Sequence, residues 1–288
     1  MSKIRKTFKY RLYPTKAQAA SLEGQIAFCC RLYNAALQER RDAWRMGRHH
    51  ISFQQQSAQL PLIKGDCPEY AEVFSQGLQN VLHRVDWAFQ GFYRRCKAGQ
   101  TPGYPRFRSR GRYDSLTYPQ AGMGWGLEGE VLSVSKGGNI KVKLHRPLEG
   151  TAKTLTLKRE CGRWYAIFSC QVEASPLAPL DNAVGLDLGL ESFLTTSDGA
   201  QVENPRHLRA AEAQLAKAQQ RVSRRRRGSN RRRKAVRLLA RQHQRVRDSR
   251  KDFHHKTARK LVETCGFIAA EDLRVANMVR NGNLSKSI

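Results

Sequence analysis

Acidic residues are scarce in this sequence of 288 residues, which has 24 Asp and Glu against 52 Lys and Arg. The formal net charge of +28 costs self-repulsion in the compact state and attracts polyanions, so a nucleic-acid backbone is the natural partner. Long apolar runs are absent too, because no stretch reaches the roughly 18 consecutive apolar residues that span a bilayer. The first ten residues lack the apolar segment of a secretory signal peptide. We therefore expect no membrane partner.

Cysteine pairs with the spacing of metal ligands are also missing. The seven cysteines are scattered, Cys29 and Cys30 are adjacent, and no C-x-x-C motif occurs. Such a set predicts neither a disulfide framework nor a zinc site, and it is typical of a reducing cytoplasm. With 40% hydrophobic residues the chain can bury a core, and its length suggests about two domains.

The first half of the sequence predicts a strand, two helices and then a small β domain. Residues 3–13 alternate apolar and basic side chains, which indicates a half-buried strand whose cationic face includes Lys9 and Arg11. Apolar residues then recur at helical spacing, and most of them are expected to be core. These positions are Leu22, Ile26, Cys29, Tyr33 and Leu37 in the first helix, and Leu78, Leu82, Val85, Phe89, Phe92 and Cys96 in the second.

A basic loop at 97–113 follows the helices, since prolines and glycines stop any regular element there. Arg106 and Arg108 are interleaved with aromatic residues, a pattern suited to phosphate contact and base stacking. A solvated basic linker is an equal alternative. Short alternating stretches from 115 to 172 predict an antiparallel β domain, and the proline-rich segment 174–180 marks a domain boundary.

Two apolar strands of the second half carry acidic residues. The stretch 183–190 contains Asp187, 192–199 is its expected antiparallel partner, and 266–273 contains Glu271. Burying a lone carboxylate costs several kcal/mol, so Asp187 is expected to meet a cation or several donors. Carboxylates on neighbouring strands can hold Mg²⁺, although acids at strand ends are common and the signal alone is weak. The pair His254-His255 is expected to point to different helix faces and is not taken as a nuclease site.

The segment between these strands predicts a basic helical hairpin. The first helix of this hairpin has apolar residues at heptad spacing, namely Leu208, Ala211, Leu215, Ala218 and Val222. The second helix has a matching apolar row of Val236, Leu239, Val246 and Phe253. Residues 221–260 hold 18 Lys and Arg against two acids, so +16 of the total charge lies within forty residues. This density exceeds what pairing along a helix neutralises, and it favours a polyanion site over a solvated face. The candidate binding residues are Arg224, Arg225, Arg226, Arg227, Arg231, Arg232, Arg233 and Lys234.

Several blocks of this sequence occur in the order found in one known family. They are KYRLYPTKAQ, RLYNAAL, GYPRFRSR, VGLDLGL, VSRRRRGSNRRRK, KDFHHKTARKLV and AAEDLRVANM. Together they cover essentially the whole chain, which resembles the TnpB family of transposon-encoded, RNA-guided DNA nucleases. These are similar to the small type V CRISPR effectors.

The resemblance implies an α+β fold in two domains. Residues 1–180 would form a small antiparallel β-barrel, called the wedge, with a helical recognition lobe inserted at about 14–112. Residues 181–288 would form an incomplete RNase H-like (RuvC) α/β domain with the basic helical hairpin at 205–263. The resemblance also implies a bacterial or archaeal protein of the cytoplasm, associated with the nucleoid.

The resemblance further implies partners and site residues. A guide RNA from a transposon end would supply sequence specificity, while the protein reads a short adjacent motif in double-stranded DNA. Asp187 matches the first RuvC acid and Glu271 the second, both as catalytic residues and as metal ligands. Gln79 and Asn80 lie on the helix that approaches the motif-bearing duplex in the family, and their amides can read adenine edges.

The sequence departs from the family pattern after Asp272. The family continues into a zinc-binding insert with two C-x-x-C pairs and then a third catalytic Asp, and neither is present here. The chain thus resembles a C-terminally truncated member with a weak or incomplete Mg²⁺ site, no zinc and little or no cleavage alone. Two alternatives stay open. One is an active Mg-dependent RNA-guided DNA endonuclease completed by a partner or another residue, and the other is a DNA- or RNA-binding protein that uses no guide.

Overall fold

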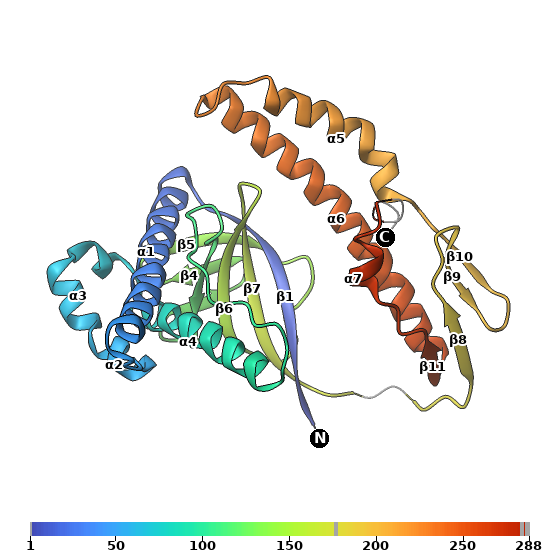
Figure 1. Ribbon diagram of the computed structural model, residues 1–288, viewed down its shortest axis with the longest axis horizontal. Helices are drawn as coiled ribbons and strands as arrows, with labels where there is room; N and C mark the ends of the chain where they lie inside the picture. The colour runs from blue at the N-terminus through green and yellow to red at the C-terminus, as the bar shows by residue number, and fades with distance from the viewer. Residues whose placement is uncertain (1, 176–177, 283–284, 286–288) are drawn as a thin grey trace. The chain divides into compact units, whose positions relative to one another are not determined.

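The computed structural model describes residues 2–175, 178–282 and 285 (Figure 1). The chain divides into two compact units, 1–174 and 175–288, and each is described by itself. Together the units give a mixed α/β architecture. Among the described residues, no helix has both the length and the apolar character needed to cross a membrane.

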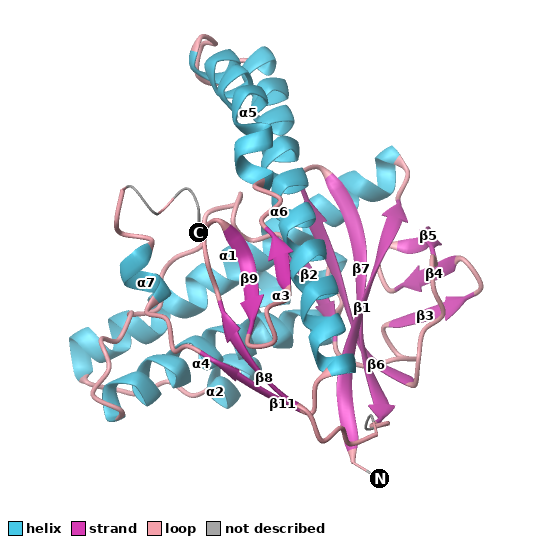
Figure 2. Ribbon diagram, turned by 90° about the vertical axis from the view of Figure 1, so that its right-hand side faces the viewer, coloured by secondary structure: helices cyan, strands magenta, loops and turns pink. Residues whose placement is uncertain are grey.

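An antiparallel seven-stranded sheet is the framework of the first unit. Its strands follow one another in the order β2-β6-β7-β1-β5-β4-β3 and curve into a nearly closed barrel (Figure 2). They are β1 (Lys3–Tyr13), β2 (Ser115–Tyr118), β3 (Trp125–Glu128), β4 (Val131–Val134), β5 (Gly138–Lys143), β6 (Thr151–Glu160) and β7 (Arg163–Glu173). The longest ladder joins β1 to β7, from Lys3 opposite Glu173 to Leu12 opposite Trp164.

The alternation along β1 explains how the barrel is filled. Phe8, Tyr10 and Leu12 are fully buried, whereas Lys9 and Arg11 lie on the opposite face. Successive side chains of a strand point to opposite faces, and burying a large apolar side chain contributes about 1.5–3 kcal/mol. The predicted half-buried strand is therefore confirmed.

Helices pack against this sheet and share its core. They are α1 (Lys16–Gly47), α2 (Phe53–Ala58), α3 (Leu60–Asp66), the 3-10 helix η1 (Pro68–Glu72) and α4 (Ser75–Lys97). The five apolar positions predicted for the first helix are all buried. On α4 the predicted row is buried only as far as Phe89, because Phe92 is half-buried and Cys96 is exposed.

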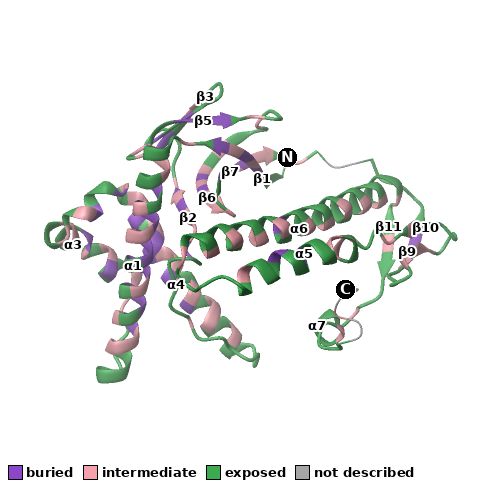
Figure 3. Ribbon diagram, turned by 90° about the horizontal axis from the view of Figure 1, so that it is seen from above, coloured by how far each residue is buried: buried purple, intermediate pink, exposed green. Residues whose placement is uncertain are grey.

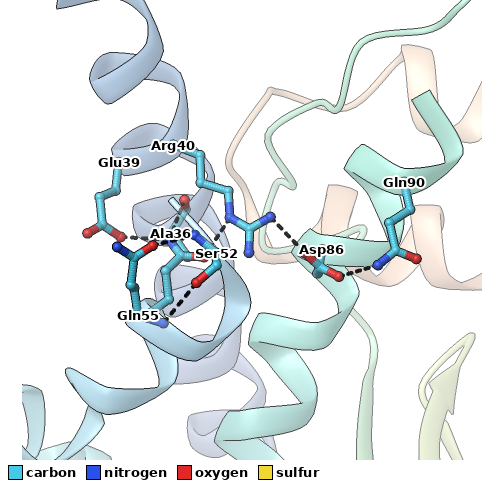
Figure 4. Close-up of polar contacts among 8 residues, drawn as sticks. Ala36, Glu39, Arg40, Ser52, Gln55, Asp86 and Gln90 are labelled. Atoms are coloured by element: carbon cyan, nitrogen blue, oxygen red, sulfur yellow. Dashed lines mark hydrogen bonds and ion pairs between the residues drawn. The ribbon is translucent and has the colours of Figure 1, made fainter. Parts of the chain in front are cut away.

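A buried arginine joins three of these helices (Figure 4). The Arg40 guanidinium on α1 donates to Gln56 on α2 at 2.8 Å and to Asp86 on α4 at 3.0 Å. The Gln56 amide in turn donates to the Ala36 carbonyl and to Glu39. Because a buried charge is costly unless paired, this network fixes the positions of α1, α2 and α4.

The second unit consists of a four-stranded sheet and a helical hairpin. Its elements are β8 (Ala183–Asp187), β9 (Ser192–Thr196), β10 (Gln201–Glu203), α5 (His207–Ser223), α6 (Asn230–Thr264), β11 (Phe267–Ala270) and the short α7 (Val275–Met278). The strand order is β10-β9-β8-β11, and β8 pairs with β9 in antiparallel and with β11 in parallel fashion. The antiparallel partner predicted for the first strand is confirmed.

The hairpin forms as predicted, with one correction to its seam. Leu215 and Ala218 of α5 are buried, and Leu239, Val246 and Phe253 of α6 are half-buried. Val236, in contrast, is 45% exposed. The neighbouring Ala235 is half-buried and lies four residues before Leu239, so it takes the predicted place of Val236 in the helical row.

Candidate nucleic-acid interface

The tip of the helical hairpin carries the densest positive charge of the chain. Helix α5 ends at Ser223 and α6 begins at Asn230, so the turn lies within the arginine run. Gly228 adopts a φ of +82°, which glycine tolerates without strain, and the Ser229 side chain caps α6. The exposed cations here are Arg224, Arg225, Arg226, Arg227, Arg231, Arg233 and Lys234.

Arg232 differs from the other arginines of the hairpin. It is half-buried, and its Nη1 donates to the Val222 carbonyl at 2.9 Å and to the Arg225 carbonyl at 3.1 Å. These bonds join the end of α5 to the start of α6. Arg232 therefore holds the turn together, and the sequence alone did not separate it from its neighbours.

The outer face of the barrel is basic, but Lys9 on this face is already paired. Its Nζ lies 2.6 Å from Glu160 and 4.2 Å from the centre of the Tyr165 ring. Burial raises the pKa of Glu160, yet the hydrogen bond and charge of Lys9 and the charge of Lys158 outweigh it and lower the pKa overall. Arg11 lies 5.2 Å from the same Tyr165 ring and opposite Lys143 in the sheet.

The basic loop between α4 and β2 is held against α1. The backbone N–H of Arg108 donates to Asn34 at 2.8 Å, and the Asn34 amide donates back to the Arg108 carbonyl at 2.8 Å. The Arg108 guanidinium lies 5.7 Å from the Tyr33 ring, and Arg106 is exposed. Phe107 is also exposed, with the Arg41 guanidinium 5.9 Å from its ring. The loop thus presents aromatic and cationic groups at fixed backbone positions.

Gln79 and Asn80 line a hollow of about 620 Å³ between α4 and the sheet. Gln79 is exposed, whereas the Asn80 amide oxygen accepts from Arg84 at 3.2 Å. Arg84 also donates to Thr117 at 2.6 Å, which fixes its guanidinium at the wall. The hollow therefore combines amide groups with an anchored cation.

An aromatic stack borders the same hollow. Phe53 stacks on His83 with ring centres 3.6 Å apart, and His83 stacks on Trp87 at 5.7 Å. Trp87 ends the stack and is 55% exposed. Arg84, His83 and Trp87 were not predicted from the sequence, although their spacing of three and four residues places them beside Asn80 on one helix face.

Asp187 and Glu271 lie at the carboxyl ends of two neighbouring strands of the second sheet. The parallel register pairs Leu186 of β8 with Ala270 of β11. Asp187 and Glu271 each directly follow that pair in the sequence, so both are at the same edge of the sheet.

The environment predicted for Asp187 is wrong. Both carboxylates are exposed, because the strand ends at Asp187 and only Val184 of β8 is buried. Asp187 therefore needs no compensation for desolvation. Within the described residues, no cluster of three or more His, Cys, Asp or Glu is arranged to hold a metal ion.

The fold and these surfaces define a basic protein built to contact nucleic acid. Residues 167–282 match a family model described as "Probable transposase", the OrfB family of IS605 elements, and residues 1–49 match its "Helix-turn-helix domain". In the structure, residues 1–49 hold a strand and the single long helix α1 in place of two short helices.

Curated relatives align with all or nearly all of this chain. A protein of Streptomyces pristinaespiralis named "Putative RNA-guided DNA endonuclease" is 37% identical over 100% of this chain and 72% of its own length. Escherichia coli K12 "Putative RNA-guided DNA endonuclease InsQ" is 28% identical over 95% of this chain and 67% of its own. The chain belongs to this family, the TnpB or OrfB family of transposon-encoded proteins.

Among solved structures, one chain of a Cas12f1–sgRNA–target DNA complex aligns with this protein. It covers 98% of this chain and 76% of its own length at 13% identity, with a TM-score of 0.38.

Proposed function

We propose that this chain is an RNA-guided DNA-binding protein of the RuvC nuclease lineage. The barrel of the first unit would be the wedge module, with α1 to α4 as its inserted recognition lobe. The second unit would be the RuvC part, with the β8–β11 strand pair carrying its acids. Guide RNA from a transposon end and double-stranded DNA with a short adjacent motif would be the partners.

The observation that carries this proposal is the exposed arginine cluster at the hairpin tip. Six arginines and Lys234 lie there in solvent. Exposed guanidinium groups pair with phosphates in bidentate fashion, and each phosphate contact releases counterions from the nucleic acid. Membership of a family whose curated relatives are named RNA-guided DNA endonucleases supports RNA as the ligand of this surface.

The test replaces Arg224, Arg225, Arg226 and Arg227 together with Gln. The dependence of log affinity on log salt is expected to flatten by about three units for single-stranded RNA, at roughly 0.7 units for each phosphate that no longer pairs with a cation. The matched control replaces the same four residues with Lys, which preserves the charge and should preserve the slope. Arg232 stays unchanged in both variants, so the turn remains intact. An unchanged slope in the Gln variant would show a solvated surface without a ligand.

Guide-independent binding is the second candidate, favoured by charge alone. RNA that purifies with the protein from its native locus separates the two functions. One discrete species from a transposon end supports guided binding, whereas a mixture of cellular RNA supports the alternative.

The acidic pair fits a Mg²⁺ ion, because carboxylate oxygens are hard donors and both side chains reach solvent. Asp187 and Glu271 would hold the ion, which when bound supplies a Lewis acid for phosphodiester chemistry. We predict little cleavage by the chain alone, since two carboxylates hold two ions in register poorly. A plasmid-cutting assay with cognate RNA, Mg²⁺ or Mn²⁺ and an Asp187→Ala control tests this. Guide-dependent cutting that disappears in the control would contradict the prediction.

A further inference from the structure

A cavity of about 670 Å³ lies in the second unit next to the acidic pair. Leu188, which directly follows Asp187, lines it from one side. Leu273, two residues after Glu271, lines it as well. Ligands of sheets with parallel strands bind outside the carboxyl ends of those strands, and this cavity has that position relative to β8 and β11.

Aromatic rings from three elements meet at the cavity wall. Phe193 of β9 stacks on His254 of α6 with ring centres 5.4 Å apart and planes inclined by 21°. Phe253 meets Phe193 edge to face at 4.8 Å and His207 of α5 at 6.1 Å. Burial lowers the pKa of His254 below its usual range, and the charges of Arg250, His207 and His255 lower it further, so the neutral form of the ring is favoured. A neutral ring stacks on aromatic groups without a charge to desolvate.

The rest of the wall is apolar and open to solvent. Leu188 and Leu190 are 44% and 39% exposed, and Val275 is 48% exposed. Exposed apolar side chains gathered at one concave place mark a binding site more often than scattered ones do. The wall thus suits a ligand with a flat, weakly polar face.

The rim of the cavity is cationic. The described residues that line it include three arginines, Arg206, Arg209 and Arg250, and a single acidic residue, Glu191. A ligand that is aromatic at one end and anionic at the other matches this arrangement.

The backbone at this rim is held in place by one asparagine. Arg206 has a φ of +44°, in the left-handed region that few non-glycine residues adopt. Its N–H donates to the Asn204 side chain at 3.0 Å, and the Asn204 amide donates to the Leu190 carbonyl at 3.2 Å. Asn204 therefore joins the cationic rim to the apolar wall, and strained backbone of this kind gathers at binding sites.

We propose that this cavity holds one unpaired nucleotide of a nucleic-acid strand, with the base against the Phe193 and His254 rings and a phosphate at Arg206 and Arg209. The proposal rests on the proposed function and deepens it, because it sets the bound strand beside Asp187 and Glu271. A paired base cannot enter, since its faces are stacked within the duplex and must first be exposed. Single-stranded nucleic acid is therefore the ligand class.

Two adjacent histidines provide a matched pair of variants. His254 lines the cavity and contacts Phe193, whereas His255 is not among the lining residues. Both are exposed on the same helix, so replacing either with Ala removes no buried side chain. The two histidines were expected to point to different helix faces, and that difference makes the comparison selective.

The experiment uses the full chain with a single-stranded DNA hexamer that contains 2-aminopurine, in EDTA so that nothing is cut. Stacking quenches the fluorescence of this base. We expect the wild type and His255→Ala to quench it equally, and His254→Ala and Phe193→Leu to lose quenching and bind about fivefold or more weakly. Arg209→Gln should weaken binding and keep the quenching at saturation. An abasic hexamer should bind as weakly to the wild type as the intact hexamer does to His254→Ala.

Equal quenching by His254→Ala and His255→Ala would overturn the proposal, as would a wild type that does not quench or an abasic hexamer that binds as tightly as the intact one. Affinity for guide RNA, measured on the same variants, reports the proposed function separately. Loss of RNA binding from the arginine-hairpin variant does not affect the quenching result, so the two proposals fail independently. Retained RNA binding by Phe193→Leu also shows that this variant is folded.

Discussion

The two units of the chain bury their side chains to very different degrees. The first has a continuous core that includes both the inner face of the barrel and the facing sides of α1 and α4. In the described part of the second, the buried residues are few, namely Val184, Leu194, Leu215, Ala218 and Gln244 (Figure 3). The first unit can therefore supply a rigid, self-sufficient surface, whereas the second presents apolar and cationic groups that a ligand would cover.

We expect the largest difference in the free energy of unfolding between two variants that each lack one acidic side chain, one in each unit. Asp86→Ala leaves the buried Arg40 charge without its carboxylate and should destabilise the first unit by about 3–5 kcal/mol. Asp252→Ala removes the exposed partner of Lys256 on α6 and should cost less than about 0.5 kcal/mol. Denaturant unfolding, followed separately for each unit by hydrogen exchange, measures both.

Equal effects of the two substitutions would contradict the contrast between the units. Gln90→Ala is a useful control, because Gln90 donates to the same Asp86 carboxylate from an exposed position. Its removal leaves the Arg40–Asp86 pair in place. We expect it to change the free energy of unfolding far less than Asp86→Ala does.

The same contrast governs how much of the fold the sequence predicted. In the first unit, a period of two along β1 and a period of three and four along α1 gave the correct elements, because a single core faces each of them. On α4 the pattern continued to Cys96 although burial stops at Phe89, since the helix extends beyond the core there. Periodicity indicates which side of an element is apolar, and it does not indicate where the covering partner ends.

Predictions for individual site residues failed where contacts between separate elements determine the role or the exposure of a side chain. Arg232 is chemically identical to Arg231, and only the carbonyls of Val222 and Arg225 distinguish it. Likewise, the expected desolvation of Asp187 assumed a buried strand, yet this residue is at the exposed end of one. The adjacency of its strand to that of Glu271 was predicted correctly, because both strands are apolar and separated by a returning hairpin.

A second prediction tests whether the rigid unit supplies specificity. Under the proposed function, Gln79→Ala should shift the preference for the DNA motif by about 1–3 kcal/mol and leave RNA affinity unchanged. Binding to a library of adjacent motifs measures this shift. Gln38→Ala, an exposed glutamine on α1 that donates to Asp42, is the matched control. A uniform loss of binding to every sequence would point to a folding defect. The variant with Gln at 224–227 in the helical hairpin should show the opposite behaviour, with reduced affinity and an unchanged motif preference.

The smallest expected effect compares two helix caps of similar chemistry. In the first unit, Thr15 accepts from the Gln18 backbone at 3.2 Å while Gln18 accepts from the Thr15 backbone at 3.0 Å. In the second, Ser229 accepts from the Arg232 backbone at 3.1 Å. Replacing either cap with Ala should cost about 1 kcal/mol.

The two costs should nevertheless appear in different measurements. Helix α1 is part of the continuous core, so Thr15→Ala should lower the unfolding midpoint of the whole first unit, by roughly 2–4 °C. Ser229 begins a largely exposed helix, so Ser229→Ala should speed amide exchange in the first turn of α6 and leave the midpoint of the second unit nearly unchanged. If Ser229→Ala instead lowered that midpoint as much as Thr15→Ala lowers its own, the hairpin would unfold together with its sheet, and the difference drawn between the two units would be wrong.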